Sequence, residues 1–226
     1  MVEERHGTGP ARADAPEEVL HTVYSVANLI TILRLLLVPF FFAVLVGGDT
    51  ERSRLTAFVI FAVAASTDWV DGQIARRTHT VTQIGKIIDP LVDRLLLAAG
   101  VLGLYLIGEI PLWIPVVLLG RDVYLLYGSY VLERHHVVLP VSRIGKLTTA
   151  VLLIGFSSLI AGWPMVDGLG IVESSQLPGW GSEPVPLGVW FVYVGIVLSL
   201  TAAAQYTVQA RRARAEAVAG ERGEAT

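Results

Sequence analysis

Residues 68–93 read DWVDGQIARRTHTVTQIGKIIDPLVD and place four aspartates on two short segments. Asp68 and Asp71 are three residues apart, and Asp89 and Asp93 are four residues apart. On an α-helix these spacings put both members of a pair on one face. Two such faces brought together form a pocket of four carboxylates.

A pocket of this kind requires positive charge. Carboxylates that lie close together repel one another, so protons, basic side chains or metal ions must neutralise them. A ligand set of oxygens without His or Cys suits hard cations such as Mg²⁺ or Mn²⁺. Because paired ions of this type stabilise the attacking and leaving oxygens of displacement at phosphorus, the pattern predicts phosphoryl-type chemistry.

The composition indicates a membrane protein. Of the 226 residues, 53% are apolar and only 16% are charged, whereas soluble domains average roughly 25% charged residues. The net charge of −3 excludes a strongly basic nucleic-acid-binding protein. The absence of cysteine excludes a disulfide framework and a thiol nucleophile.

Hydropathy predicts an all-α integral membrane protein with six transmembrane helices in one domain over 25–210. Most of the apolar stretches approach the ~20 residues that cross a bilayer; they lie at about 29–46, 55–67, 88–108, 112–132, 147–163 and 186–206. Lys and Arg gather on alternate connections, which predicts a multi-pass protein of the cytoplasmic membrane with residues 68–93 facing the cytoplasm. We expect 1–24 to be a disordered cytoplasmic tail, 211–226 a cytoplasmic tail, and 164–185 an extracytoplasmic loop.

Small residues and a cation between the aspartates complete a longer pattern. Gly72, Ala75, Arg76 and Gly85 extend the four acids to D-x2-D-G-x2-A-R-x8-G-x3-D-x3-D. This spacing resembles, at all eight positions, the signature of the CDP-alcohol phosphatidyltransferases. The resemblance covers the predicted six-helix core from about 28 to 209.

The resemblance implies a metal-dependent enzyme of glycerophospholipid synthesis, commonly homodimeric, that transfers the phosphatidyl group of CDP-diacylglycerol to an alcohol and releases CMP. It implies that two divalent cations, Mg²⁺ or Mn²⁺, are bound by Asp68, Asp71, Asp89 and Asp93, with Asp93 also the catalytic base. The implied CDP-lipid pocket comprises Gly72, Ala75, Arg76, Gly85 and Thr31. The implied acceptor-binding residues are Arg34, Arg121, Arg143 and Lys146.

The sequence leaves the identity of the acceptor alcohol open between two main candidates. Glycerol 3-phosphate is favoured because that activity is common in the family, whereas the Arg121-Asp122 sequence resembles the cardiolipin synthase branch, whose acceptor is phosphatidylglycerol. Inositol phosphate is a more distant candidate. Arg121 and Asp122 could instead be structural, with Asp122 paired to a neighbouring helix. A divalent-cation transporter is the alternative from another class, since intramembrane carboxylates also mark ion paths.

Overall fold

The computed structural model describes residues 26–78, 83–133 and 143–224, and the side chains within 32–67, 94–132 and 144–212. Its helices in these ranges are α2 Val26–Gly47, α3 Glu51–Thr78, α4 Gln83–Leu106, α5 Trp113–Glu133, α6 Arg143–Ala161 and α7 Gly188–Glu224. Two short strands, β1 Met165–Val166 and β2 Val185–Pro186, pair antiparallel. The helical class and the six predicted helical stretches are therefore confirmed, while the predicted tail 1–24 lies outside the described residues.

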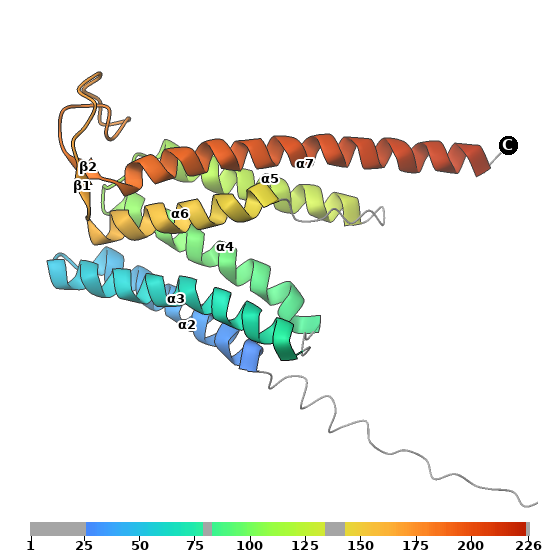
Figure 1. Ribbon diagram of the computed structural model, residues 1–226, viewed down its shortest axis with the longest axis horizontal. Coiled ribbons are helices and arrows are strands. Elements are labelled where there is room, and N and C mark those ends of the chain that lie inside the picture. The colour runs from blue at the N-terminus through green and yellow to red at the C-terminus, as the bar shows by residue number, and fades with distance from the viewer. Residues whose placement is uncertain (1–25, 79–82, 134–142, 225–226) are drawn as a thin grey trace, which may run out of the picture.

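The helices form a bundle with two distinct ends (Figure 1). α2 packs on α3, α6 packs on α7, and α4 crosses between these pairs, with α5 alongside α7. We call the end that holds the α2–α3 turn, the α4–α5 turn and the strands the cap end. The opposite end, where α3 finishes and α4 starts, holds residues 68–93 and is called the motif end.

Local hydrogen bonds set the helix ends at the cap end. Thr50 and Ser53 cap the start of α3 reciprocally, since each side-chain oxygen accepts the backbone N–H of the other residue. α4 and α6 each end on a glycine in the left-handed region, Gly108 with φ 81° and Gly162 with φ 67°. In both cases the two closing backbone bonds are those of a Schellman motif, so the chain leaves each helix in a fixed direction.

Arg54 joins three elements at the cap end. Its Nη1 lies 2.7 Å from Oε1 of Glu109 in the α4–α5 turn. Its Nη2 and Nε donate to the last carbonyls of α6, those of Leu159 at 3.0 Å and Ile160 at 3.3 Å. A cation at a helix C-terminus satisfies carbonyls that have no partner within the helix and interacts favourably with the helix dipole.

The segment predicted as a loop over 164–185 is folded against the bundle. Strand pairing closes its two ends, and its middle returns over α5 and α7. Trp113 Nε1 donates to the Gln176 carbonyl at 2.8 Å, and the Tyr193 hydroxyl donates to the Pro178 carbonyl at 2.9 Å. The segment therefore forms an ordered cover for the cap end.

One packed layer of aromatic rings sets the register of the bundle core. The rings of Phe41 in α2 and Phe61 in α3 have centroids 5.1 Å apart, and both side chains are fully buried. α4 meets them at Gly100, where a Cβ atom would lie 3.2 Å from Phe61 and 3.3 Å from Phe156 of α6. The absence of a side chain at Gly100 therefore lets α4 approach two aromatic rings closely.

The outer faces of the bundle are apolar. Leu36 and Phe40 of α2, Val123 of α5 and Val197 of α7 are each more than half exposed. Within the described ranges, Ile144–Ala161 of α6 and Gly188–Arg212 of α7 are long and apolar enough to cross a membrane. The apolar segments Ile32–Gly47 and Arg94–Leu106 are shorter there, so this criterion supports the prediction of six spans only in part.

Replacing Gly100 by leucine should destabilise the bundle, because the new side chain would have to displace Phe61 or Phe156. Overpacking of this kind typically costs about 1–3 kcal/mol, which thermal unfolding in detergent would register as a lower Tm. Gly120→Leu is the matched control, since nothing lies within 4 Å of a Cβ at that exposed position of α5. Equal Tm values for the two variants would contradict the packing argument.

Candidate active site

The signature positions lie on two helices at the motif end. Asp68, Asp71, Gly72, Ala75 and Arg76 fall in the second half of α3. Gly85, Asp89 and Asp93 fall in the first half of α4. Their side chains lie outside those that the structure describes, as does the connection 79–82. The backbone nevertheless fixes the face of the helix on which each position lies; we call a row of positions along one face a stripe.

On α3, the signature continues the buried stripe. Ala57, Phe61 and Ala64 are fully buried and face the neighbouring helices of the core. Helical periodicity carries the same stripe on to positions 68, 71 and 75. Three signature positions of α3 therefore share the face that packs inside the bundle.

On α4, the signature leads into the stripe that meets α2 and α3. Gly100 abuts Phe61, Leu96 is buried, and a Cβ at Gly103 would lie 2.6 Å from the Leu45 side chain of α2. Steps of three and four residues back from Leu96 reach positions 93, 89 and 85. The two stripes that carry the four aspartates thus meet in the same interior seam.

The aromatic layer also places the aspartates relative to α2. Seven residues from Phe61 along α3 is Asp68, and seven residues back from Gly100 along α4 is Asp93. Seven residues are two helical turns, about 10 Å, and both steps run toward the motif end. The same step along α2, from Phe41, reaches Arg34. Positions 34, 68 and 93 therefore each lie two turns from the aromatic layer, toward the motif end.

Arg34 is the largest buried polar residue among those described, with 1% of its surface exposed. Full burial of a guanidinium requires an anion or several hydrogen bonds, because desolvation of an unpaired charge is expensive. Arg34 lies on α2, which packs against both α3 and α4, the helices that carry the aspartates. The prediction that Arg34 binds the acceptor stays untested, but its burial favours a role inside the carboxylate cluster. Thr31 lies one turn earlier on α2, and its side chain is outside the described set.

Arg121 is already engaged by protein groups. Its Nη1 lies 2.7 Å from Asp122 Oδ1, and its Nε donates to the Ser199 carbonyl of α7 at 3.3 Å. Asp122 therefore pairs with its own sequence neighbour, and Arg121 supplies the link to another helix. The pair borders a cavity of about 30 Å³, room for roughly one water molecule, together with Thr148 and Thr149 of α6. Acceptor binding by Arg121 stays a prediction.

Two other predicted acceptor-binding residues, Arg143 and Lys146, lie in the first turn of α6. Arg143 is the first residue of that helix, with its side chain outside the described set. Lys146 is exposed, whereas Thr148 on the following half-turn is 2% exposed. The structure thus brings Arg121 and the α6 threonines to one cavity and leaves Lys146 at the surface.

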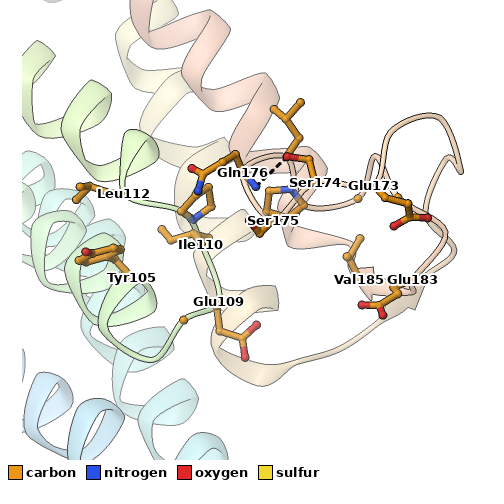
Figure 2. Close-up of a pocket in the computed structure, with 16 residues that line it drawn as sticks. Tyr105, Glu109, Ile110, Leu112, Glu173, Ser174, Ser175, Gln176, Glu183 and Val185 are labelled. Atoms are coloured by element: carbon orange, nitrogen blue, oxygen red, sulfur yellow. Dashed lines mark hydrogen bonds between the residues drawn. The ribbon is translucent and has the colours of Figure 1, made fainter.

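Among the residues that the structure describes, one sizeable cavity lies at the cap end, away from the signature. It encloses about 690 Å³ between the α4–α5 turn and the 162–187 segment (Figure 2). Its charged lining residues are Glu109, Glu173 and Glu183, with no Lys or Arg among the residues that border it. The Ser182 N–H and hydroxyl both donate to Glu173, which lowers the pKa of that carboxyl. An acidic cavity disfavours phosphate-bearing substrates, so the motif end is the candidate active site.

The donor set at the motif end fits divalent cations. Four carboxylate positions share one seam, and oxygen ligands without sulfur or imidazole suit Mg²⁺ or Mn²⁺. Because these side chains are not described, the metal site stays a prediction.

One contact of the structure escaped the sequence analysis, and Arg94, which the sequence suggested only as an ion-pair partner of Asp93, has a buried donor that is not satisfied. The bridge between Arg54 and Glu109 spans 55 residues of chain and has no local signal. Arg94 follows the last signature aspartate, and its Nη1 is buried without a hydrogen-bond partner. A basic residue beside a carboxylate in an apolar helix was the available sequence signal.

Known proteins resemble this chain over most of its length. The family model for CDP-alcohol phosphatidyltransferase matches residues 24–201. A probable phosphatidylglycerophosphate synthase of Mycobacterium tuberculosis is 36% identical over 131 residues, which cover 57% of this chain and 62% of that protein. A cardiolipin synthase (CMP-forming) of Streptomyces coelicolor is 31% identical over 185 residues, 77% of this chain and 84% of that protein. The CDP-diacylglycerol–glycerol-3-phosphate 3-phosphatidyltransferase of Bacillus subtilis is 30% identical over 149 residues, 61% of this chain and 77% of that protein.

The contact between Arg121 and Asp122 should be measurable as a coupling. Arg121→Gln and Asp122→Asn each break the pair and leave a part-buried partner, at an expected cost of about 1–3 kcal/mol. The double variant should lose little more than the worse single variant, because only one interaction is removed. Unfolding of all four proteins in the same detergent completes the cycle. Additive losses would mean that the two residues are stabilised independently.

Proposed function

Because the chain belongs to the CDP-alcohol phosphatidyltransferase family, we propose that it transfers the phosphatidyl group of CDP-diacylglycerol to an alcohol with release of CMP. The observation that carries the proposal is the complete eight-position signature on α3 and α4, two helices that pack together at Phe61 and Gly100. Neither a scaffold nor a set of structural ion pairs requires glycines and acids at all of these spacings.

We assign the roles within the site from the family signature, and the chemistry of the residues agrees with them. Asp68, Asp71, Asp89 and Asp93 hold two divalent cations, which supply charge compensation at the phosphoryl oxygens. Asp93 accepts the proton of the attacking acceptor hydroxyl. The CDP-lipid pocket is formed by Gly72, Ala75, Arg76, Gly85 and Thr31. Binding of both substrates at one membrane surface aligns the hydroxyl with the phosphorus of the diacylglycerol phosphate.

As acceptor we propose glycerol 3-phosphate, which would make the product phosphatidylglycerophosphate. Two of the relatives described above carry names for that reaction, and one of these has the highest identity of the three. Phosphatidylglycerol is the second candidate, since the cardiolipin synthase of Streptomyces coelicolor aligns with more of this chain. Both acceptors carry a phosphate, so the site needs a cation for either.

We further propose that all six helices cross the cytoplasmic membrane, with the motif end facing the cytoplasm and the protein acting as a homodimer. The apolar outer faces of α2, α5 and α7 support burial in lipid, because a soluble monomer would not expose such surfaces. The excess of Lys and Arg on the connections at the motif end supports the orientation. The family relationship favours this reading over the divalent-cation transporter.

A direct assay tests the proposal. Purified protein in liposomes with CDP-diacylglycerol and Mg²⁺ should release CMP when glycerol 3-phosphate is added, and chelation of the metal should stop release until Mg²⁺ is restored. Phosphatidylglycerol and inositol phosphate are offered separately. Release with phosphatidylglycerol alone would make cardiolipin synthesis the activity. A folded, metal-loaded protein that releases no CMP with any of the three acceptors would contradict the proposal.

Asp93→Asn should abolish transfer while CDP-diacylglycerol still binds, because an amide cannot take the hydroxyl proton. A loss of at least 10²-fold in kcat is expected from general-base removal. Asp167→Asn, an exposed acid at the cap end, is the control and should keep wild-type turnover. Near-normal turnover of Asp93→Asn would remove this residue as the base.

A further inference from the structure

Arg94 presents a buried donor that the protein does not satisfy. Its Nη1 has almost no solvent contact and no hydrogen-bond partner, and among the described residues no ion pair includes Arg94. An unsatisfied, buried charged donor is costly and therefore rare in native proteins. Such an atom at a candidate active site indicates a place for a bound anion.

Arg94 does not share the stripe of the signature aspartates. One turn further along α4, Leu97 and Ala98 occupy the same face as Arg94 and border the small cavity beside Arg121. The signature stripe instead runs through Leu96 and Gly100 toward α3. Arg94 is therefore on the face of α4 that points toward α5 and α6, about 100° around the helix from position 93.

The polar groups nearest to that face are mostly satisfied. Asp122 is paired with Arg121 at 2.7 Å, and the hydroxyls of Thr148 and Thr149 donate to carbonyls of their own helix. The cavity these residues border has no second described carboxylate to neutralise Arg94. A ligand that pairs with Arg94 must therefore be an anion, and it would enter from the motif end, where α4 begins.

We propose that Arg94 binds the phosphate of the acceptor alcohol, an inference that rests on the proposed transferase activity. A guanidinium matches phosphate oxygens with two parallel donors and adds charge. The donor-binding signature lies on the α3 side of α4, so a phosphate at Arg94 belongs to the other substrate. Arg94 then holds the phosphate of the acceptor, and Asp93, the preceding residue of α4, receives the proton of the acceptor hydroxyl.

The test compares Arg94→Gln and Arg94→Lys with wild type in the CMP-release assay, with each substrate varied at saturation of the other. We expect the KM for the acceptor to rise at least tenfold in Arg94→Gln, with the KM for CDP-diacylglycerol changed less than twofold. Arg94→Lys should recover part of the loss because it keeps the charge. The same split should hold for glycerol 3-phosphate and for phosphatidylglycerol, whichever the wild-type protein uses.

Controls separate this inference from the proposed function. Arg211→Gln removes an equal charge from an exposed position of α7 and should leave both KM values unchanged. Binding of glycerol 3-phosphate or inorganic phosphate without CDP-diacylglycerol, measured by calorimetry, should weaken in Arg94→Gln whether or not turnover is seen. If wild type releases CMP but both KM values move equally, or only that of CDP-diacylglycerol moves, Arg94 is not the acceptor anchor. If wild type releases no CMP, the transferase proposal fails first.

Discussion

The close contact between Phe61 and Gly100 is the constraint on which the interior of the bundle depends. It brings α3 and α4 together in a layer completed by Phe41 and Phe156. Because helices are rigid over two turns, contact in this layer also sets the heights of positions two turns away. Those positions are Arg34, Asp68 and Asp93. A packing contact about 10 Å from the candidate chemistry thus determines how far these charged groups lie from the aromatic layer.

The spacing of residues along each helix was enough to predict most of this arrangement. Hydropathy predicted the six helices, and the i,i+3 and i,i+4 spacings predicted that each aspartate pair shares a face. Those inferences succeed because helical periodicity is a local property. The β1–β2 pairing and the contact from Arg54 to Glu109 could not be predicted, since their partners are distant in sequence. The loop composition of 164–185 indicated turns but contained no periodic pattern that would reveal its docking.

Charge balance explains why three arginines in similar surroundings differ in their ability to bind an anionic ligand. Arg121 is neutralised by Asp122, so a ligand would have to compete with an existing pair. Arg34 is fully buried in α2, where a guanidinium needs an anion or several hydrogen bonds. Arg94 directly follows the last signature aspartate in the sequence, and its Nη1 is a buried donor that has no hydrogen-bond partner. Sequence shows three basic residues near acidic ones, and only packing separates their roles.

The two ends of the bundle differ in charge as well as in structure. At the cap end, the cavity is lined by carboxylates, and the Arg54 guanidinium near it is held by Glu109 and by the carbonyls that end α6. At the motif end, four carboxylates require cations, and cations in turn attract phosphate groups. The acidic cavity at the cap end disfavours phosphate groups, whereas the cations that we propose at the motif end would attract them. The ordered cover at the cap end holds the helices in place without competing for the same substrates, which leaves the motif end free to bind them.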